Sequence, residues 1–366
     1  MMLDAQDLDD LAAGAVLLAT GGGGDPYVAT LCTRAVLAEH GPAQLIAPDD
    51  LPDDAFVAAI GGVGAPSVGL ELLPSIDEPL RAVEAFEAQV GRQLNALVPF
   101  EIGGGNSMVP IMAAAARGIP VIDGDGMGRA LPEAQMMTFA IAGIAPTPAI
   151  AIDYAGNHLS FASSDVLTYE RHLRAVTAAM GGMALTVEQP MSGAQLKAAV
   201  VPGTISFARQ LGRLLRTRRG PAEALLAPLA AVFADSLYGS FHHLFTGKVV
   251  DRSSTVVGGF DVGQTKLAAL GAAEDILTLD IRNEYLIARR GAQLLASVPD
   301  LISVLDYETG TPINAERLRY GQRVCVIGIG APGIYRSAAA LAVTAPRCFG
   351  FDLDYVPIET LNAGSP

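Results

Sequence analysis

The chain has 366 residues, of which 51% are apolar, so it is long enough for about two domains that each bury a core. Only 17% of the residues are charged and the net charge is −14, which argues against a phosphate-neutralising surface for nucleic acid. We therefore expect a small-molecule partner and no nucleic acid.

The three cysteines, Cys32, Cys325 and Cys348, are too scattered for a disulfide framework and form no CxxC pair. The amino terminus is acidic and lacks the basic and apolar regions of a signal peptide, and no apolar run reaches about 18 residues. These features predict a cytoplasmic protein without a membrane partner. The apolar composition also leaves room for a buried subunit interface, so we expect a homo-oligomer.

In chain order, residues 7–18 have the apolar spacing of a helix, with Asp7 as a candidate cap, and a glycine run follows at 21–24. Residues 55–61 are typical of a buried strand, and 79–94 have helical spacing. The sequence then predicts a strand at 96–101, a helix at 107–117 and a strand at 119–123. Together they predict a βαβ crossover and a parallel sheet.

A further apolar run at 149–153 predicts another strand, and we place a domain boundary near residue 165. Residues 1–165 are expected to form an open, largely parallel α/β domain. Residues 166–366 are expected to form a mixed α+β domain, helical to about 237 and then β-rich at 248–257, 276–281, 284–289, 301–305 and 323–329. The predicted fold class is therefore α/β with a second, mixed domain.

The glycine-rich motif TGGGGDPY occupies residues 20–27. Consecutive glycines permit positive φ and let backbone amides point at an anion or a carbonyl oxygen. Gly22, Gly23, Asp25 and Tyr27 are therefore candidates for substrate binding. The alternative is a tight loop that ends a helix, because neither GxGxxG after a strand nor GxxxxGK[ST] is present.

The motif EIGGGNSM, residues 101–108, lies at the carboxyl end of a predicted strand and the start of a helix. Open α/β sheets bind ligands at this place, and the helix amino terminus supplies free amides there. Glu101 is a catalytic candidate, and Gly104 and Asn106 are binding candidates. A purely structural alternative is that Asn106 or Ser107 caps the helix.

The motif IDGDGMGRALPE, residues 122–133, follows the neighbouring predicted strand and should lie beside Glu101. Several carboxylates around one crevice can divide into acid and base, or can bind a divalent cation. Asp123 and Asp125 are thus catalytic candidates, and Arg129 and Glu133 are binding candidates. In the simpler alternative, the aspartates form turn hydrogen bonds and Arg129 pairs with Glu133.

Other polar residues are less informative. The five histidines do not form a pattern typical of a zinc site, and His242 and His243 are adjacent, so their side chains diverge. Lys248 and the pair Asn283–Glu284 enter strand-like segments and fit a cleft or an exposed strand equally well. No organic cofactor is expected, and a divalent metal remains an open alternative.

These motifs, together with RNEYLIA, PDLISVLDYETGTPI, RYGQRVCVIG and PRCFGFDLDYVP, resemble in order the S-methyl thiohydantoin desulfurase family, long known as a domain of unknown function. The resemblance covers essentially the whole chain. It implies an amino-terminal α/β domain with a smaller carboxyl-terminal domain. Members commonly accompany hydantoinase-type genes, which implies a hydantoinase-type partner.

The resemblance implies that water replaces the S-methyl group at carbon 2 of a thiohydantoin ring, which gives a hydantoin and methanethiol. Such a reaction needs a base for water and a proton donor for the ring nitrogen. We expect Asp123 or Asp125 to act as the base or to bind an activating metal, and Glu101 to contact the ring N–H. Asn106 and the amides of residues 21–24 would position the ring, and Arg129 would pair with a substrate carboxylate or organise the acids.

Three functions compete. A hydrolase requires Asp123, Asp125 and Glu101 to share one cleft. A noncatalytic subunit of a hydantoinase or oxoprolinase complex predicts a large exposed apolar surface and no convergent acids. A nucleotide-binding protein predicts a glycine loop at a strand end with its amides directed at phosphate.

Overall fold

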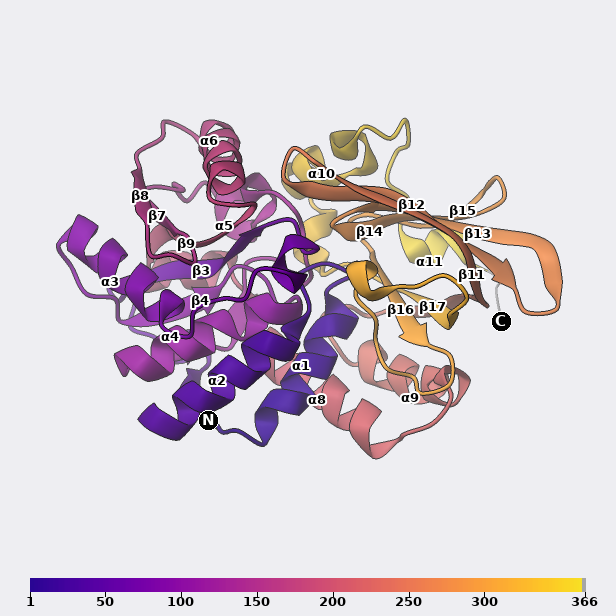
Figure 1. The fold of residues 1–366 in the computed structure, drawn as a ribbon, viewed down its shortest axis with the longest axis horizontal. Helices are drawn as coiled ribbons and strands as arrows, with labels where there is room; N and C mark the ends of the chain where they lie inside the picture. Colours follow the sequence, from indigo (N-terminus) through magenta and orange to yellow (C-terminus); the bar gives the residue numbers. More distant parts are fainter. Residues whose placement is uncertain (364–366) are drawn as a thin grey trace.

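The computed structural model describes residues 1–363. Two parts lie side by side along the longest axis of the molecule (Figure 1). The part that contains the amino terminus is a sheet covered by helices, and the other part consists mainly of long strands. The α/β class with a second, strand-rich domain is thereby confirmed.

The first part is built on an eight-stranded sheet with the order β1-β2-β5-β4-β3-β9-β7-β8. Only the pairs β2–β5, β5–β4 and β4–β3 are parallel, so the sheet is mixed, not largely parallel as expected. One reason is the short turn at residues 153–157, which forces β7 and β8 to pair antiparallel. The strands are Met2–Leu3 (β1), Ala43–Ile46 (β2), Phe56–Gly64 (β3), Ala96–Pro99 (β4), Val121–Ile122 (β5), Ala149–Ile152 (β7), His158–Phe161 (β8) and Met183–Ser192 (β9).

Helices cover both faces of this sheet, because residues along β3 alternate between two cores. Ala58 and Ile60 join the core beneath α1 to α4 and α8, whereas Val57 and Ala59 join the core beneath α5 to α7. The helices are Asp7–Leu18 (α1), Pro26–His40 (α2), Glu78–Val90 (α3), Val109–Arg117 (α4), Thr138–Ile141 (α5), Val166–Ala179 (α6), Gly193–Ala199 (α7), Thr204–Thr217 (α8) and Ala222–Ala234 (α9).

The predicted crossover is confirmed, since β4, α4 and β5 follow one another and the two strands are parallel. The predicted cap of α1 is wrong. Gln6 occupies the position before the helix, and Asp7 is already its first residue. The Asp7 carboxylate instead accepts hydrogen bonds from the amide of Asp4 and from Arg209.

The second part is a curved, seven-stranded antiparallel sheet that forms a half-barrel, with the order β15-β14-β13-β12-β11-β17-β16. Its strands confirm the five β-rich segments expected after residue 237. They are Phe241–Val257 (β11), Phe260–Ala269 (β12), Ala272–Arg282 (β13), Glu284–Arg290 (β14), Gln293–Ser297 (β15), Leu301–Asp306 (β16) and Arg323–Ile329 (β17). Two short strands, Gly124–Asp125 (β6) and Val201–Pro202 (β10), pair separately, and the helices Ala338–Thr344 (α10) and Ile358–Leu361 (α11) follow the sheet.

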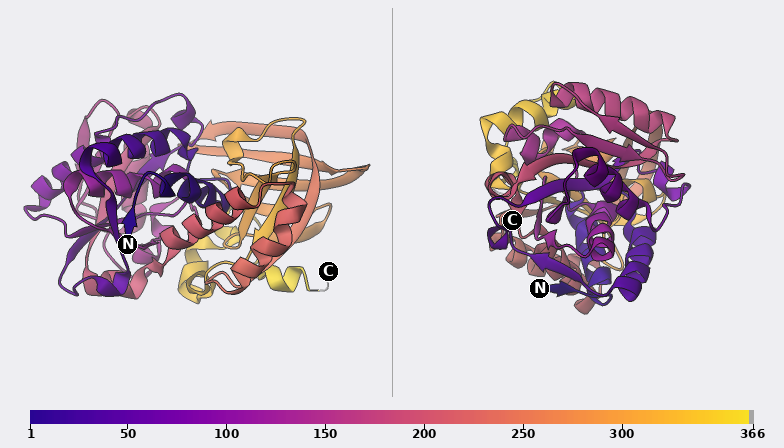
Figure 2. Two further views of the ribbon diagram at one scale, coloured as in Figure 1. Left: turned by 90° about the horizontal axis from the view of Figure 1, so that it is seen from below. Right: turned by 90° about the vertical axis from the view of Figure 1, so that its left-hand side faces the viewer.

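Segments after residue 165 complete the first part. Strand β9 lies between β3 and β7, so the expected boundary near 165 separates it from the sheet to which it belongs. Helix α8 packs directly on α1, because Gly14 faces the backbone of Ala208 and Gly212 faces that of Asp10. A Cβ atom at either glycine would lie 1.7 Å from a carbonyl oxygen of the other helix. The pair is seen side by side in Figures 1 and 2. Within residues 1–363, no helix has the length and apolar character needed to cross a membrane.

Candidate active site

A cavity of about 680 Å³, its opening included, lies where the two parts meet. We call it the acid cavity, because five glutamates contribute to its wall: Glu101, Glu133, Glu170, Glu188 and Glu284. The segments that form it are the glycine loop at 21–24, the end of β3, the loops after β4 and β6, helix α6, strand β9 and the turn between β13 and β14. Four of these glutamates, Glu101, Glu170, Glu188 and Glu284, are buried and lie on different elements, and of these Glu170 forms an ion pair with Arg174.

Glu101 follows β4 and is held on both oxygens. Its Oε1 accepts a hydrogen bond from Asn106 Nδ2 at 2.8 Å, and its Oε2 accepts one from the amide of Leu131 at 3.1 Å. Asn106 is fixed in turn, because its Oδ1 accepts from the amide of Gly62 at 2.7 Å. Burial raises the pKa of Glu101 to about 8, against the effect of these hydrogen bonds.

Glu188 reaches the cavity from β9 beside a β-bulge. Gln189 and Pro190 together lie opposite a single residue of β3, and Gln189 has a φ of 52°. Glu188 Oε2 accepts hydrogen bonds from the hydroxyl groups of Tyr169 and Thr186, while Oε1 has no partner within residues 1–363. The side chain is 1% exposed, and burial raises its pKa to about 8.

Glu284 comes from the second part. Asn283 connects β13 to β14 as a single residue with a φ of 60°, a conformation that asparagine tolerates well. The amide of Asp261 donates to Asn283 Oδ1 at 2.8 Å, which fixes the turn. Glu284 is 2% exposed, and its Oε2 has no partner in the described part of the chain. Burial and then the charge of Glu101 raise its pKa well above the ordinary value, while Arg129 opposes this rise.

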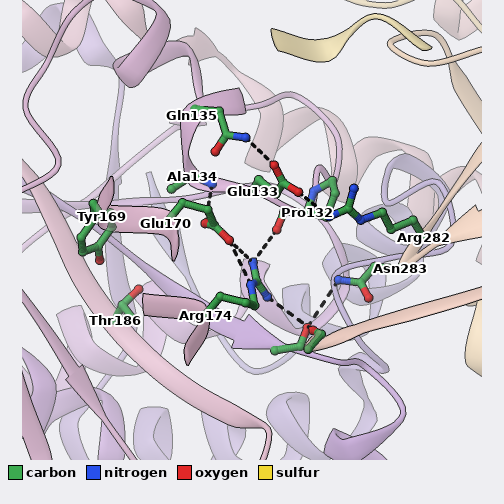
Figure 3. A network of polar contacts seen from close by, with 12 residues as sticks. Pro132, Glu133, Ala134, Gln135, Tyr169, Glu170, Arg174, Thr186, Arg282 and Asn283 are labelled. Carbon is green, nitrogen blue, oxygen red and sulfur yellow. Dashed lines mark hydrogen bonds and ion pairs between the residues drawn. The ribbon is translucent and has the colours of Figure 1, made fainter. Parts of the chain in front are cut away.

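Two arginines, Arg174 and Arg282, pair with glutamates of the acid cavity (Figure 3). Arg174 on α6 contacts Glu170 Oε1 at 2.8 Å, and Arg282 contacts Glu133 Oε1 at 2.5 Å. Their guanidinium groups each lie 4.1 Å from the centre of the Phe260 ring. Glu170 and Glu133 are therefore paired with arginines, in contrast to Glu188 and Glu284, which each keep one oxygen without a partner in the described residues.

The two loops that were expected to meet do so, since Glu101 bonds to Leu131. Of the residues proposed from the sequence, Gly23, Glu101, Asn106 and Glu133 line the acid cavity. Asp25 caps α2 through the amide of Tyr27, pairs with Arg317, and lines an adjoining cavity instead. Tyr27 is 65% exposed and lines neither of these two cavities.

The structure corrects the placement of both aspartates. The Asp123 carboxylate accepts hydrogen bonds from the amide and hydroxyl of Ser206 in the first turn of α8, and it does not line the acid cavity. Asp125 is fully buried, and its Oδ2 accepts from the amides of Ile102, Met127 and Gly128, which ties the two loops together. Burial raises the pKa of Asp125 to about 7. Neither aspartate is among the residues that line the acid cavity.

Arg129 does not pair with Glu133, nor does it line the acid cavity. It is fully buried and donates to the carbonyl groups of Pro299 and Asp300 and to the hydroxyl of Thr20, at 2.6, 3.0 and 2.9 Å. Arg129 was expected to contact a substrate carboxylate or to organise the acids. In the structure its hydrogen bonds instead link the two parts of the molecule.

The glycine loops pack on one another and on the second part. The amide of Gly105 donates to the carbonyl of Gly23 at 2.9 Å, and a Cβ atom at Gly104 would lie 2.1 Å from the carbonyl oxygen of Gly24. A Cβ atom at Gly22 would lie 2.2 Å from Glu284 Oε1. Glycine is therefore required at these positions, because a side chain would collide with the neighbouring backbone or with the carboxylate of Glu284.

Four further residues of the site, Glu170, Arg174, Glu188 and Glu284, were not assigned to it from the sequence. For Glu284, the sequence fitted a position in a cleft and a position on an exposed strand equally well. The signal that could have favoured the cleft is the preceding asparagine, Asn283, a residue type that often occupies tight turns. Glu188 lies in a segment that was interpreted as helical, so its direction could not be inferred. Within residues 1–363, no three His, Cys, Asp or Glu side chains are grouped so that they could hold a metal ion.

Models of the S-Me-THD-like family match residues 6–163 as the N-terminal domain and residues 163–358 as the C-terminal domain. The chain belongs to the S-Me-THD-like family. Comparison with curated proteins gives no match. An X-ray crystal structure of a protein from Chromobacterium violaceum is similar over 98% of this chain and 100% of that chain, with 26% identity and a TM-score of 0.80. The S-Me-THD-like fold therefore comprises both parts of the molecule, and the acid cavity draws residues from both family domains.

Proposed function

We propose that this protein hydrolyses an S-methyl thiohydantoin to the hydantoin and methanethiol, with the acid cavity as its active site. The observation that carries the proposal is that Glu101, Glu188 and Glu284 converge there while buried. Burying a carboxyl group is unfavourable unless it is paired, and strongly displaced pKa values are typical of catalytic acids and bases. Membership of the S-Me-THD-like family supports this substrate class.

In this proposal Glu188 is the general base. Its free Oε1 takes a proton from water, whose oxygen attacks carbon 2 of the ring. Glu284, whose pKa burial raises well above the ordinary value, is the general acid and donates a proton to the ring nitrogen as the C=N bond opens. Glu101, held by Asn106 and Leu131, accepts a hydrogen bond from the ring N–H and thereby orients the ring.

The tetrahedral intermediate then collapses. The carbon–sulfur bond breaks with its electron pair on sulfur, and methanethiolate takes the proton from Glu188. The hydroxyl group on carbon 2 returns a proton to the carboxylate of Glu284 as the carbonyl forms. The products are the hydantoin and methanethiol, and both glutamates regain their starting protonation states.

The other two functions considered fit the cavity less well. Among the described residues, the arginine that lines the cavity, Arg174, is already paired with Glu170, so a phosphate group would gain no free counter-ion there, which argues against a nucleotide. A noncatalytic subunit would gain nothing from the burial of three carboxyl groups in one cavity.

The test is turnover of a panel of S-methyl thiohydantoins, 2-thiohydantoins and hydantoins, scored for ring product and released thiol, with and without a chelator. Because the base acts when deprotonated, kcat/KM should rise about tenfold per pH unit until it levels off near the pKa of Glu188, about 8. No turnover of any compound by folded protein would refute the proposal.

The matched variants are Glu188→Gln, Glu284→Gln and Glu316→Gln. The first two should lower kcat by about 10²- to 10⁴-fold. Glu316 is also a carboxyl group whose pKa burial raises, to about 7, but it lies outside the acid cavity, so its variant should retain activity. Equal losses in all three variants would contradict the assigned roles.

A further inference from the structure

A second cavity, of about 990 Å³ with its opening included, adjoins the acid cavity. We call it the apolar chamber, because aliphatic side chains such as Val28, Leu70, Leu73, Val109 and Leu185 form most of its wall. The two cavities share Gly23, Gly24, Gly62, Pro66, Asn106 and Met183. They are therefore two compartments of one site that meet at a common wall.

The common wall is largely backbone at the place where the ring would lie. Asn106, which bonds to Glu101, faces both compartments, and its Oδ1 is held by the amide of Gly62. Gly62 carries no side chain, and a Cβ atom there would meet Asn106 Oδ1 first, at 3.3 Å. The shared residues place the chamber directly beside a ring bound at Glu101 and Asn106, on the side where Gly23, Gly24 and Gly62 carry no side chains.

The charged groups of the chamber are already paired. Arg317 forms an ion pair with Asp25, and Glu78 accepts a hydrogen bond from the amide of Ser75 at 3.2 Å. A charged group placed among the aliphatic side chains would lose its hydration without gaining a counter-ion. An alkyl or aromatic group would instead bury apolar surface favourably.

We propose that the substrate ring carries an uncharged apolar substituent, of isobutyl to benzyl size, which occupies the apolar chamber and determines specificity. The inference rests on the proposed function, since it takes the ring to be bound in the acid cavity. The substituent belongs on C5, the ring carbon that bears side chains in hydantoins derived from amino acids. Apolar pocket contacts of this size should raise kcat/KM by about 10- to 100-fold over the unsubstituted ring.

The experiment compares S-methyl thiohydantoins that carry hydrogen, isobutyl, benzyl or carboxymethyl at C5. The chain offers a site for a blocking variant, since Gly69 lines the chamber, has no positive φ, and a Cβ there would contact only Met183 Cε at 3.8 Å. Gly69→Leu should lower kcat/KM for the benzyl substrate at least tenfold more than for the unsubstituted ring. Gly333→Leu is the control, because that glycine has open space around its Cβ position and lies outside both cavities.

Binding provides a second measurement that does not depend on turnover. Calorimetry with 5-benzylhydantoin and with hydantoin should show tighter binding of the benzyl compound, and Gly69→Leu should abolish the difference. Equal kcat/KM for all four rings, a preference for carboxymethyl, or equal effects of Gly69→Leu on benzyl and unsubstituted rings would overturn the chamber proposal alone. Absence of turnover with all rings would overturn the proposed reaction, while calorimetry would still decide whether the chamber binds the benzyl group.

Discussion

Asp123 and Glu188 both accept a hydrogen bond from a hydroxyl group, yet their surroundings assign them different tasks. Asp123 is half-buried, and its two oxygens bind the amide and hydroxyl of Ser206, so it acts as a capping group for α8. Glu188 is buried and keeps one oxygen without a partner in the described residues. The residue type alone does not distinguish these cases, whereas burial and partners do.

Asp123→Ala tests this distinction. The variant should lose about 1 kcal/mol of stability, because the first turn of α8 loses its side-chain acceptor, and it should keep its kcat. Urea denaturation and turnover on the same preparation measure the two quantities. A hundredfold fall in kcat with normal folding would instead return Asp123 to the mechanism.

The pH dependence of stability tests the environment of Glu188. Its pKa rises from 4.5 to about 8 on folding, so the native state binds the proton more tightly than the unfolded state. The stability that this carboxyl group contributes is complete below about pH 4.5 and is lost as the pH rises through 8. Glutamine resembles the protonated form at every pH. The melting temperature of Glu188→Gln relative to the parent protein should therefore increase between pH 5 and pH 9, by an amount that corresponds to a few kcal/mol at about 1.4 kcal/mol per pKa unit. A constant difference across this range would contradict the assignment.

Among the elements, the glycine loops at residues 21–24 and 103–105 connect α1, β4 and β14 through close contacts. Their amides and carbonyls bond to each other, and Glu284 and Tyr285 press against Gly22 and Gly21. The loops therefore set the position of Glu284 relative to Glu101.

Gly104→Ala and Gly24→Ala separate backbone strain from steric contact. Both glycines have positive φ, 46° and 73°, so each alanine should cost about 1–2 kcal/mol in conformation. Only Gly104 also has a carbonyl oxygen 2.1 Å from its Cβ position, whereas Gly24 has open space there. Gly104→Ala should thus be less stable than Gly24→Ala by about 1–3 kcal/mol in chemical denaturation. Equal losses of stability in the two variants would mean that the two glycine loops move apart at little cost.

The elements also show how much of the fold and of the site can be predicted from the sequence. Periodicity and strand-end motifs predict α1, β3, α4, β5 and the meeting of two loops, because these depend on neighbouring residues. Strand β9 was not predicted, since its β-bulge and its insertion between β3 and β7 depend on distant partners. Glu101 and Asn106 could be placed because they follow β4. Glu188 and Glu284 could not, because the insertion of β9 into the first sheet brings in Glu188 and the contact between the two parts brings in Glu284.

At the scale of the whole molecule, Arg129 links the two parts. Its planar guanidinium group donates to two carbonyl groups of the β15–β16 connection and to Thr20 beside the glycine loop. The buried carboxyl groups of Glu284, Asp300 and Glu101 lie close enough to favour its charge. One side chain thereby offsets part of the negative charge beside the acid cavity and bonds the two parts of the molecule to each other.

Arg129→Met should lower stability by about 3–5 kcal/mol, because it leaves buried acceptors and carboxyl groups unpaired. Arg347→Met is a suitable control, since that arginine pairs with Asp352 and Asp354 at the exposed surface and should leave the unfolding midpoint unchanged. Thermal and urea unfolding monitored on both variants would compare them. Similar midpoints for the two variants would rule out this role for Arg129.

The position of β9 has a consequence for dividing the chain. The two family models meet at residue 163, so each half carries part of the acid cavity: Glu101 precedes the junction, and Glu188 and Glu284 follow it. Expressed alone, the first half would present two unpaired strand edges at β3 and β7, which invites aggregation. Expressed together, the halves could recover a working site only by inserting β9 between those edges. Recovered activity from co-expressed fragments would therefore report strand insertion, and the protein could serve as a reporter of that single assembly event.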